Sequence, residues 1–369
     1  MINPVKTYKI DGRKLSGDEI LSLALEKVSV IDTPQWERDM WAFLLQWFGP
    51  GKTITVKTSG STGEPGEILL KKSDMVKSAE NTISFFKLNP GDITLLCLPV
   101  KYIAGKMMVI RALTGKLDLR YIRPVAEPDY PPELEIRFAA MTPMQVAGIL
   151  KGEKGREKLE QIEKLIIGGA AVPPGLEKDL KDLQTDIWHT YGMTETITHI
   201  AFRSLNAEKG SRWFKPLAGV TVRIASNGCL VIDYPDIGVR GFETGDLAEV
   251  RDDGDFRILG RIDNMVNSGG IKLFPESLEQ RIGDLKAPTW FLAGIDDETL
   301  GQRLVMLVED DAGSKPDLAG IKQKVLSVLE GHERPKQFFL LPGFIRTENG
   351  KLRRKETLKQ LDKKGAREF

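Results

Sequence analysis

The sequence predicts an α/β protein, with a large N-terminal part of several sheets and helices and a smaller α+β C-terminal part. Three observations support this prediction. Short apolar runs alternate with helix-like segments through the first half of the chain. From about residue 216 the sequence changes to short β-rich pieces. After Gly260-Arg261 a new pattern of helices and strands begins. We therefore place a domain boundary at 260–264.

The first predicted elements are helices within residues 19–48, where apolar residues recur at helical spacing and a proline interrupts them. Strands at 53–59 and 67–72 flank a loop that contains glycine and proline. Ser73 is then expected to cap a helix that runs to Phe86.

The remaining elements follow from the same patterns. Five apolar runs have the composition of buried strands: 92–100, 117–122, 136–142, 164–170 and 185–192. An Asp-Gly turn between two strands is expected at 251–258. The C-terminal part should contain helices near 275–284 and 316–330 and strands near 289–295 and 303–309.

Composition argues against several function classes. At 369 residues with 41% hydrophobic content, the chain can form a sizeable core. Its net charge of +1 gives no reason to expect a nucleic-acid or anionic-membrane partner. The sequence has neither the apolar core of a signal peptide nor a run of about 18 apolar residues, so we expect a cytoplasmic protein. Cys97 and Cys229 are expected to be buried free thiols.

Two neighbouring segments, Gly51-Lys52-Thr53 and Thr58-Ser59-Gly60-Ser61-Thr62-Gly63, have the composition of phosphate-binding loops. The first lacks the glycine that a P-loop carries five residues before its Gly-Lys pair, and it leads into a predicted strand, not a helix. The second combines hydroxyl groups with glycines that let backbone N–H groups converge on one anion. The alternative is a Ser/Gly surface turn; we favour anion binding by residues 58–63.

A second candidate lies in the segment HTYGMTETITH, directly after a predicted strand. Glu195 beside threonine hydroxyls suits Mg²⁺ and the phosphate that the ion bridges, because Mg²⁺ prefers hard oxygen ligands. The alternative is a helix N-terminus with Thr194 as its cap. His189 and His199 lack a third nearby ligand, so zinc binding is not expected.

Three features of the second half become informative only in combination. Asp246 lies in a glycine-containing turn, where it can accept hydrogen bonds from a ribose diol or cap its own turn. Residues 266–275 form a glycine turn that leads into a proline-started helix. Lys351 lies on an exposed loop, where a surface lysine is the default interpretation.

Taken together, the chain resembles the adenylate-forming superfamily of acyl-CoA synthetases, luciferases and peptide-synthetase adenylation domains. Six segments carry the resemblance in type, order and spacing: TSGSTGEP, GGAAVPP, YGMTET, TGDLAEV, GRIDNMVNSGGIKLFPESLE and ENGKLRR. The resemblance covers about residues 53–355. It implies a large ATP- and acid-binding domain at 1–260, a small mobile domain at 264–369 and a hinge at 261–263, with Asp263 at the hinge position.

The resemblance also implies roles for single residues. The implied ATP-binding residues are Gly169, Ala170 and Tyr191 around the adenine, Asp246 and Arg261 at the ribose, Thr58, Ser59, Gly60, Ser61, Thr62 and Gly63 at the β- and γ-phosphates, Thr194 at phosphate and Glu195 at Mg²⁺.

Lys351 matches the lysine of the first half-reaction, in which a carboxylate attacks the α-phosphate of ATP and charge builds on the non-bridging oxygens. Rotation of the mobile domain would then withdraw Lys351. The same rotation would bring Gly269, Gly270 and Lys272 to the path of the CoA thiol.

Two positions depart from the family pattern. Gly66 stands where most relatives carry a lysine, so a weaker grip on the triphosphate of ATP is expected. Tyr102 stands three residues before Gly105, in the register of a histidine that many relatives have at the acid pocket. The way in which this chain holds its acid is therefore left open.

Within the family, the short N-terminal part and the segments YIAGKMMVIRAL and YGMTETITHIA look like the o-succinylbenzoate–CoA ligases of menaquinone biosynthesis. This implies an aryl dicarboxylic acid, ATP and CoA as small-molecule partners, with no nucleic acid and no membrane insertion, and it leaves a homodimer open. A cation or hydroxyl must then meet the carboxylate that does not react, and Lys106 and Thr198 are the candidates.

Three alternatives remain. The chain is another small aryl or acyl acid–CoA ligase, an enzyme that passes the adenylate to a carrier protein, or a non-catalytic nucleotide binder. The presence of Lys351, Glu195 and Asp246 argues against the non-catalytic binder.

Overall fold

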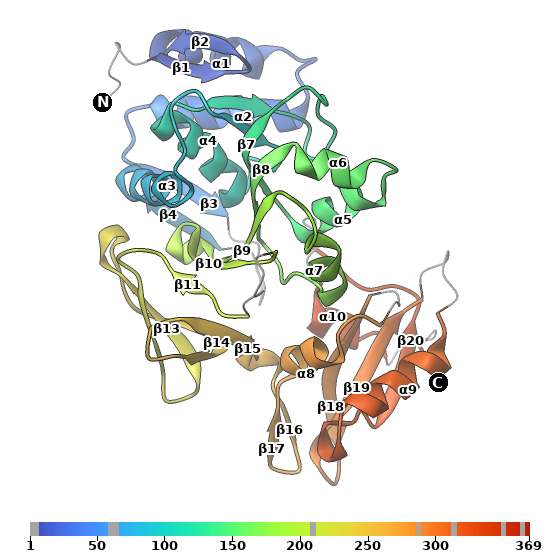
Figure 1. Cartoon of the computed structure of the whole chain (residues 1–369). Helices are drawn as coiled ribbons and strands as arrows, with labels where there is room; N and C mark the ends of the chain where they lie inside the picture. Colours follow the sequence, from blue (N-terminus) through green and yellow to red (C-terminus); the bar gives the residue numbers. More distant parts are fainter. Residues whose placement is uncertain are drawn as a thin grey trace. The chain divides into compact units, whose positions relative to one another are not determined.

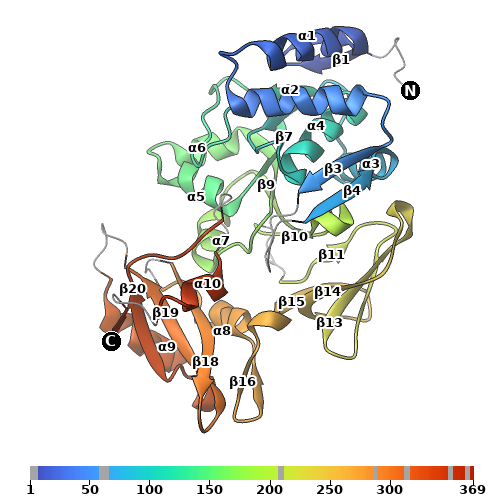
Figure 2. The same ribbon diagram turned by 180° about the vertical axis from the view of Figure 1, so that it is seen from behind.

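The structure, a computed structural model, describes residues 7–57, 66–206, 212–285, 289–310, 316–347, 352–361 and 366–369. The chain divides into two compact units (Figures 1 and 2). Unit 1 comprises Met1–Val172, Asp179–Thr221 and Asp233–Arg240, and unit 2 comprises Pro173–Lys178, Val222–Ile232 and Gly241–Phe369. Within the described ranges, no helix is both long and apolar enough to cross a bilayer.

The centre of unit 1 is a nine-stranded sheet. Its strands are β1 (Thr7–Ile10), β2 (Arg13–Ser16), β5 (Ile93–Leu96), β6 (Asp118–Tyr121), β7 (Ile136–Met141), β8 (Ile162–Ile167), β9 (Asp186–Gly192), β10 (His199–Ser204) and β11 (Lys215–Pro216). Their order is β11-β10-β9-β8-β7-β5-β6-β1-β2. The pairs from β9 to β1 are parallel, whereas the outer pairs are antiparallel. Near-continuous apolar runs in the central strands fit a sheet that is covered on both faces.

Six helices belong wholly to unit 1: α1 (Gly17–Ser29), α2 (Gln35–Phe48), α3 (Lys72–Phe86), α4 (Ile103–Gly115), α5 (Pro143–Lys151) and α6 (Gly155–Glu160). Helices α3 and α4 lie side by side (Figures 1 and 2). Phe86 of α3 packs on Phe138 of β7 and Phe202 of β10, with ring centroids 5.2 and 5.1 Å apart. Helix α4 is buried along Gly105–Leu113, a stretch that is apolar apart from Lys106 and Arg111.

A separate hairpin of β3 (Thr53–Lys57) and β4 (Glu67–Lys71) pairs in antiparallel register. It encloses residues 58–65, which lie outside the described residues. Helix α7 (Pro174–Leu180) and the 3₁₀ turns η1 (Thr194–Thr196) and η2 (Pro235–Ile237) are the remaining helical elements that begin before residue 239.

A four-stranded sheet follows, with β12 (Thr221–Ile224), β13 (Cys229–Tyr234), β14 (Val239–Val250) and β15 (Phe256–Arg261) in that order, and β14 and β15 are antiparallel. Strands β14 and β15 are joined by the predicted turn, in which Gly254 has a φ of +87°. That φ is accessible to glycine at little cost.

The C-terminal sheet of unit 2 has the order β17-β16-β19-β20-β21, with β18 also paired to β19. The strands are β16 (Val266–Ser268), β17 (Ile271–Leu273), β18 (Trp290–Asp297), β19 (Gly301–Glu309), β20 (Gln337–Leu341) and β21 (Arg367–Glu368), and the helical elements are α8 (Pro275–Ile282), α9 (Leu318–Val328), α10 (Arg354–Leu358), η3 (Ile262–Asn264) and η4 (Gly331–Glu333). Alternate residues of β18 and β19 enter two cores, one with α8 and α9 and the other with α10.

The predicted α/β class is confirmed, and so is each predicted strand within a few residues. Ser73 is wrong as a helix cap, because β4 runs into α3 without a loop and the N-cap is Lys71. Cys97 and Cys229 are buried free cysteines, as predicted, and burial raises the pKa of Cys97 to about 12. The predicted boundary at 260–264 lies inside unit 2, between its two sheets, and stays a prediction.

Candidate active site

Four parallel strands of unit 1 (β5, β7, β8 and β9) end at one edge of the sheet. The order of the chain reverses between β5 and β7, because β6 lies on the other side of β5. In open α/β sheets, ligands bind at the carboxyl edge beside such a switch point. The predicted residues that follow these strands are Tyr102 and Gly105 after β5, Gly169 and Ala170 after β8, and Thr194 and Glu195 after β9.

The turn after β8 depends on close backbone approaches. A Cβ atom on Gly168 would lie 2.3 Å from the Thr190 hydroxyl, and Gly169 has a φ of +84°. A Cβ atom on Gly169 would meet no atom within 4 Å, so its backbone is open on that side. An uncovered backbone of this kind suits the flat face of a base.

A buried histidine contacts the same turn. Arg203 Nε donates to His189 Nδ1 at 3.1 Å, which leaves His189 Nε2 to donate to the Ala170 carbonyl at 3.3 Å. Burial, aided by the charge of Arg203, lowers the pKa of His189 to about 3, so the imidazole is neutral. His189 therefore positions the predicted adenine segment. From the sequence alone, His189 could be recognised only as a residue of a predicted strand.

The segment after β9 folds through a strained turn. Ile197 has φ 67° and ψ −56°, and the N–H of Thr198 donates to the Thr196 carbonyl at 2.7 Å. This is the γ-turn with positive φ, which is rare and costly for a β-branched residue. Thr196, fully buried, supports it: its Oγ1 lies 2.8 Å from the Thr198 carbonyl, to which its single hydrogen can be donated, and 3.1 Å from the Met193 carbonyl.

Glu195 is exposed at the same edge and Thr194 is half-buried. Among the described residues, no three His, Cys, Asp or Glu side chains converge as a metal cluster. A Mg²⁺ ion at this edge would therefore combine Glu195 with oxygens of a bound phosphate, which suits the hard-oxygen preference of the ion. Tyr191 packs its ring on Phe214, with centroids 5.8 Å apart.

The residues predicted for the acid pocket do not all come together. Tyr102 is the N-cap residue of α4, and a Cβ atom on Gly105 would lie 2.4 Å from the Pro99 carbonyl oxygen, so glycine is required there. Lys106 Nζ lies over the ring of Phe43 in α2, 4.7 Å from the ring centroid. Burial lowers the pKa of Lys106, and the charge of Asp39 offsets only part of this effect. The ammonium group of Lys106 therefore points to α2, whereas the side chain of Thr198 contacts a different cation.

That cation is Arg111 of α4, whose side chain is 1% exposed. Its Nη2 donates to Thr198 Oγ1 and its Nε to Thr82 Oγ1, each at 3.2 Å. Burial lowers the pKa of Arg111 to about 9. Sequence reasoning missed this residue, although a single arginine inside the apolar run KMMVIRAL was a visible signal.

In unit 2, the two residues predicted at the ribose are in contact. Asp246 of β14 and Arg261 of β15 face each other across the sheet, and Arg261 Nη1 donates to Asp246 Oδ1 at 3.0 Å. Arg261 Nη2 lies 3.5 Å from the carboxylate of Asp263, the predicted hinge residue. A Cβ atom on Gly245 would lie 2.7 Å from Arg261 Nη2, so this glycine makes room for the guanidinium.

Gly269 and Gly270 form the two-residue turn between β16 and β17, with φ of +60° and +84°. Glycines are favoured at both positions of such a turn. Lys272 is exposed on β17. The turn alone accounts for both glycines, and their role at the CoA path stays a prediction.

The phosphate-loop residues Thr58, Ser59, Gly60, Ser61, Thr62 and Gly63 and the catalytic candidate Lys351 lie outside the described residues. The stems of both loops are described. Strands β3 and β4 pair up to Lys57 and Glu67 on either side of the first loop. Arg346 and Leu352 form an antiparallel bridge on either side of the second.

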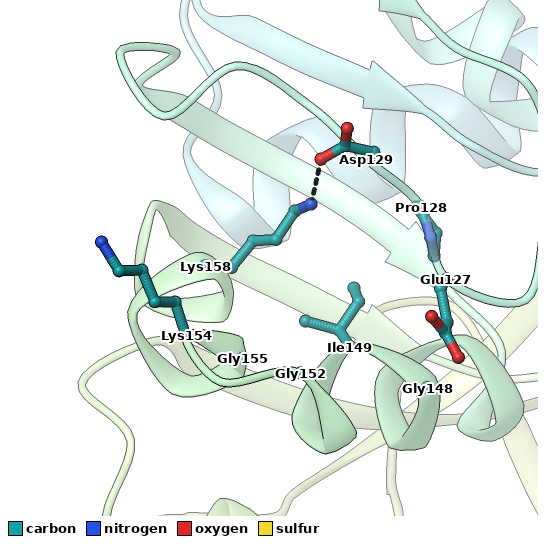
Figure 3. A pocket seen from close by; sticks show the side chains of 9 residues that line it. All are labelled: Glu127, Pro128, Asp129, Gly148, Ile149, Gly152, Lys154, Gly155 and Lys158. Atoms are coloured by element: carbon teal, nitrogen blue, oxygen red, sulfur yellow. Dashed lines mark hydrogen bonds and ion pairs between the residues drawn. The ribbon is translucent and has the colours of Figure 1, made fainter.

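A hollow of about 260 Å³ lies on the surface of unit 1 (Figure 3). It is lined by Glu127, Pro128, Asp129, Gly148, Ile149, Gly152, Lys154, Gly155 and Lys158. Lys158 and Asp129 pair with each other at 2.5 Å at its rim. None of the predicted site residues lines this hollow.

The residues at the carboxyl edge of unit 1 lie within a segment that matches a known protein family. Residues 56–234 match the family model described as AMP-binding enzyme. This match includes the turns after β8 and β9. Residues 56–234 therefore form a domain of the AMP-binding enzyme family.

Sequence relatives of this chain include the 2-succinylbenzoate–CoA ligase of Geobacillus sp. (strain WCH70). It is 27% identical over 335 residues, which cover 82% of this chain and 68% of the relative. A solved structure from Dyadobacter fermentans, an acyl-CoA synthetase (AMP-forming)/AMP-acid ligase II-like protein, is 29% identical, with 92% of this chain and 98% of that chain covered and a TM-score of 0.60.

The fold of this chain is also similar to that of o-succinylbenzoate CoA synthetase from Bacillus subtilis, solved in complex with the acyl-adenylate intermediate OSB-AMP. The TM-score is 0.75 at 16% identity, with 96% of each chain covered. At this identity the similarity shows the fold alone.

Proposed function

We propose that this AMP-binding enzyme is an ATP-dependent acid–CoA ligase that works through an acyl-adenylate, with o-succinylbenzoate as its acid. The observation that carries the proposal is the carboxyl edge of unit 1, where the open turn at Gly169-Ala170 and the segment Thr194-Glu195 follow neighbouring strands. The similarity to proteins named 2-succinylbenzoate–CoA ligase supports this acid.

The proposed reaction has two steps. A carboxylate oxygen of the acid attacks the α-phosphorus of ATP, and the bond to the β-phosphate oxygen breaks to release pyrophosphate. The CoA thiol, losing its proton, then attacks the acyl carbon of the adenylate and releases AMP. Both steps depend mainly on positioning and on stabilisation of charge on phosphate oxygens.

Each group of residues has a proposed part in the first step. The backbone at Gly169-Ala170, held by His189, provides a face for the adenine. Asp246, paired with Arg261, accepts hydrogen bonds from the ribose. Residues 58–63 and Thr194 hold phosphate, Glu195 holds Mg²⁺, and Lys351 stabilises the charge that develops at the α-phosphate. The Mg²⁺ ion, when bound, neutralises charge on the phosphate oxygens.

Cytoplasmic location is part of the same proposal, because the chain would draw on ATP and CoA and both of its cysteines are free thiols.

A pyrophosphate-release assay with a panel of aryl and aliphatic acids, run with and without CoA, tests the proposal. We expect release with o-succinylbenzoate, and a new thioester of matching mass only when CoA is present. Turnover with another aryl acid but none with o-succinylbenzoate would show that the proposed acid is wrong. An adenylate that forms but does not pass to CoA would instead favour transfer to a carrier protein.

Two glutamate variants distinguish the effect of a change in the proposed site from the effect of a change elsewhere on the surface. Glu195→Gln removes the proposed Mg²⁺ ligand and should lower pyrophosphate release by about 100-fold or more. Glu153→Gln changes an exposed carboxylate of unit 1 away from the edge and serves as the control. Equal activity of the two variants would show that Glu195 is not part of the site.

A further inference from the structure

Arg203 of β10 is connected to the predicted adenine turn, Gly169-Ala170, through one side chain. It lies directly opposite His189 in the antiparallel pair of β9 and β10. Arg203 Nε donates to His189 Nδ1 at 3.1 Å, and His189 Nε2 lies 3.3 Å from the Ala170 carbonyl oxygen. Two hydrogen bonds through a buried imidazole therefore join a guanidinium to the backbone of the turn.

The hydrogen bond from Arg203 fixes the tautomer of His189. An arginine side chain has only N–H donors and keeps its proton in proteins, so His189 Nδ1 has to accept. A neutral imidazole whose Nδ1 accepts carries its hydrogen on Nε2, where it is donated to the Ala170 carbonyl. In the other tautomer the lone pair of Nε2 would face that carbonyl oxygen, and the turn would lose its donor.

Protonation of His189 does not compete with this arrangement. Burial, and after it the charge of Arg203, lowers the pKa of His189 to about 3, so the imidazole is neutral at neutral pH. The groups that face the ring are Arg203 from β10, the Ala170 carbonyl from the turn after β8 and the ring of Phe214, and of these three Arg203 alone carries a charge. The imidazole therefore has one hydrogen for two nitrogens, and Arg203 determines which nitrogen carries it.

Phe214 holds the guanidinium and the imidazole in place. Its buried ring has its centroid 5.5 Å from Arg203 Cζ and 5.2 Å from the ring centroid of His189. A guanidinium over an aromatic ring is attracted by the π electrons of the ring. Phe214 also packs on Tyr191, the other residue predicted at the adenine, with ring centroids 5.8 Å apart. The ring that packs on Tyr191 therefore also contacts Arg203 and His189.

We propose that Arg203 is a positioning residue for the nucleotide, which fixes the tautomer of His189 and, through it, the carbonyl of Ala170. The inference rests on the proposed function, because it deepens the adenine part of that site. Since Arg203 acts through His189, its loss should weaken the binding of ATP and of AMP alike. The chemical step at saturating ATP should change little, because contacts to the adenine are the same before and after the reaction.

Two substitutions of Arg203 differ in one hydrogen-bond donor. Glutamine has its amide nitrogen at the position along the side chain where arginine has Nε, so Arg203→Gln keeps an N–H for His189 Nδ1 and removes the positive charge. Arg203→Met has a methyl group at that position. Nitrogen NMR of the imidazoles at pH 7 reports the tautomer, and His189→Gln identifies the signals of His189 among the three histidines. We expect the Nε2–H tautomer in wild type and in Arg203→Gln, but not as the single form in Arg203→Met.

Nucleotide affinity should follow the tautomer. For each protein, the Kd of AMP and of ATP is measured by calorimetry, and kcat and KM for ATP by pyrophosphate release. Arg203→Met should raise both Kd values and the KM for ATP by about 5-fold or more, because a buried carbonyl loses its donor, while kcat changes by less than about 2-fold. Arg203→Gln should recover most of this loss.

A second background separates the tautomer from other effects of Arg203. The amide of His189→Gln has no tautomers and can donate to Ala170 whatever residue stands at 203, so Arg203→Met should cost less affinity there than in wild type. Arg137→Met is the matched control, because it removes a half-buried guanidinium of β7 that pairs with Glu163 and should leave the Kd of AMP as in wild type.

Three results would overturn the inference: the Nδ1–H tautomer in wild type, equal losses of affinity in Arg203→Gln and Arg203→Met, or an equal cost of Arg203→Met in both backgrounds. The first is read without any substitution and so holds even if Arg203→Met does not fold. A loss in Arg203→Met that is expressed in kcat alone would also overturn it. Arg203-dependent binding of AMP without pyrophosphate release from any acid would support the inference and sink the proposed ligase function instead.

Discussion

Arg354 at the start of α10 and Glu279 of α8 form a two-point ion pair inside unit 2. Arg354 Nη1 donates to Glu279 Oε1 and Nη2 to Oε2, each at 2.6 Å, and the two side chains are 21% and 16% exposed. Glu279 Oε1 also accepts from the backbone N–H of Leu292 in β18. Arg354 follows Lys351 by three residues. The pair therefore ties the segment that follows Lys351 in the sequence to the core of unit 2.

Replacing Arg354 with Met should destabilise unit 2, because Glu279 then keeps a mostly buried carboxylate without its partner. We expect the free energy of unfolding to fall by about 1–3 kcal/mol, less than for a fully buried pair. Urea denaturation measures the change. Arg367→Met is the control, because Arg367 pairs with Asp310 while 69% exposed and should change stability by about 0.5 kcal/mol or less. If the additional change Glu279→Leu does not recover stability in the Arg354→Met background, the pair is not the cause.

Lys351→Ala tests whether the two half-reactions use different residues. We expect adenylation, followed as pyrophosphate release, to be abolished, because the charge developing at the α-phosphate loses its ammonium. Thioester formation from supplied acyl-adenylate should be spared. Lys355→Ala removes an exposed lysine of α10 and is the control. Loss of both half-reactions to the same extent would contradict a mobile lysine that serves only the first.

Much of the fold was predictable because its signals are local. The buried strands of unit 1 are short apolar runs, and the turn between β14 and β15 carries an Asp-Gly pair. The hairpin of β1 and β2 was missed although Asp11-Gly12 is the same kind of signal, with φ of 51° and 78°. Its strands are only four residues long, too short for alternation alone to identify.

The site was predictable only where its residues lie in contiguous motifs. The turn at Gly169-Ala170 and the segment Thr194-Glu195 were predicted this way, and parallel strands bring them to one edge. Arg111 was missed because its partners Thr82 and Thr198 are 29 and 87 residues away in the sequence. Lys106 was a candidate because the carboxylate that does not react needs a cation or a hydroxyl, but the structure turns its ammonium to Phe43 of α2.

Gly66→Lys tests the departure from the family pattern next to the phosphate loop. Restoring a cation where most relatives carry one should lower the KM for ATP, because an added positive charge attracts the triphosphate. Steady-state pyrophosphate release at varied ATP measures the effect. Gly66→Gln, of similar length and without charge, is the control. Unchanged ATP kinetics in Gly66→Lys would mean that this position does not face the triphosphate.

Asp118 of β6 gives the fold a stabilising contribution that depends on pH. Its fully buried carboxylate lies 2.8 Å from Lys9 Nζ and accepts hydrogen bonds from the N–H of Gly12 and from Arg120, each at 3.0 Å. Burial alone would raise the pKa of Asp118, but the bonds from Lys9, Gly12 and Arg120 together hold it below the usual value. A lowered pKa means that the contribution is complete above the unfolded pKa, about 3.9, and is lost as the pH falls through the folded value.

Asp118→Asn should therefore cost about 1–3 kcal/mol of unfolding free energy at pH 7. The difference from wild type should shrink as the pH falls below about 4, because the wild-type carboxylate then takes up a proton. Urea denaturation of both proteins between pH 7 and pH 3 measures this trend. Asp11→Asn is the matched control: Asp11 is exposed, lies 3.8 Å from Arg120 and has a positive φ that asparagine also tolerates. A difference between wild type and Asp118→Asn that is the same at pH 3 and pH 7 would show that the charge of Asp118, as distinct from its shape, contributes nothing.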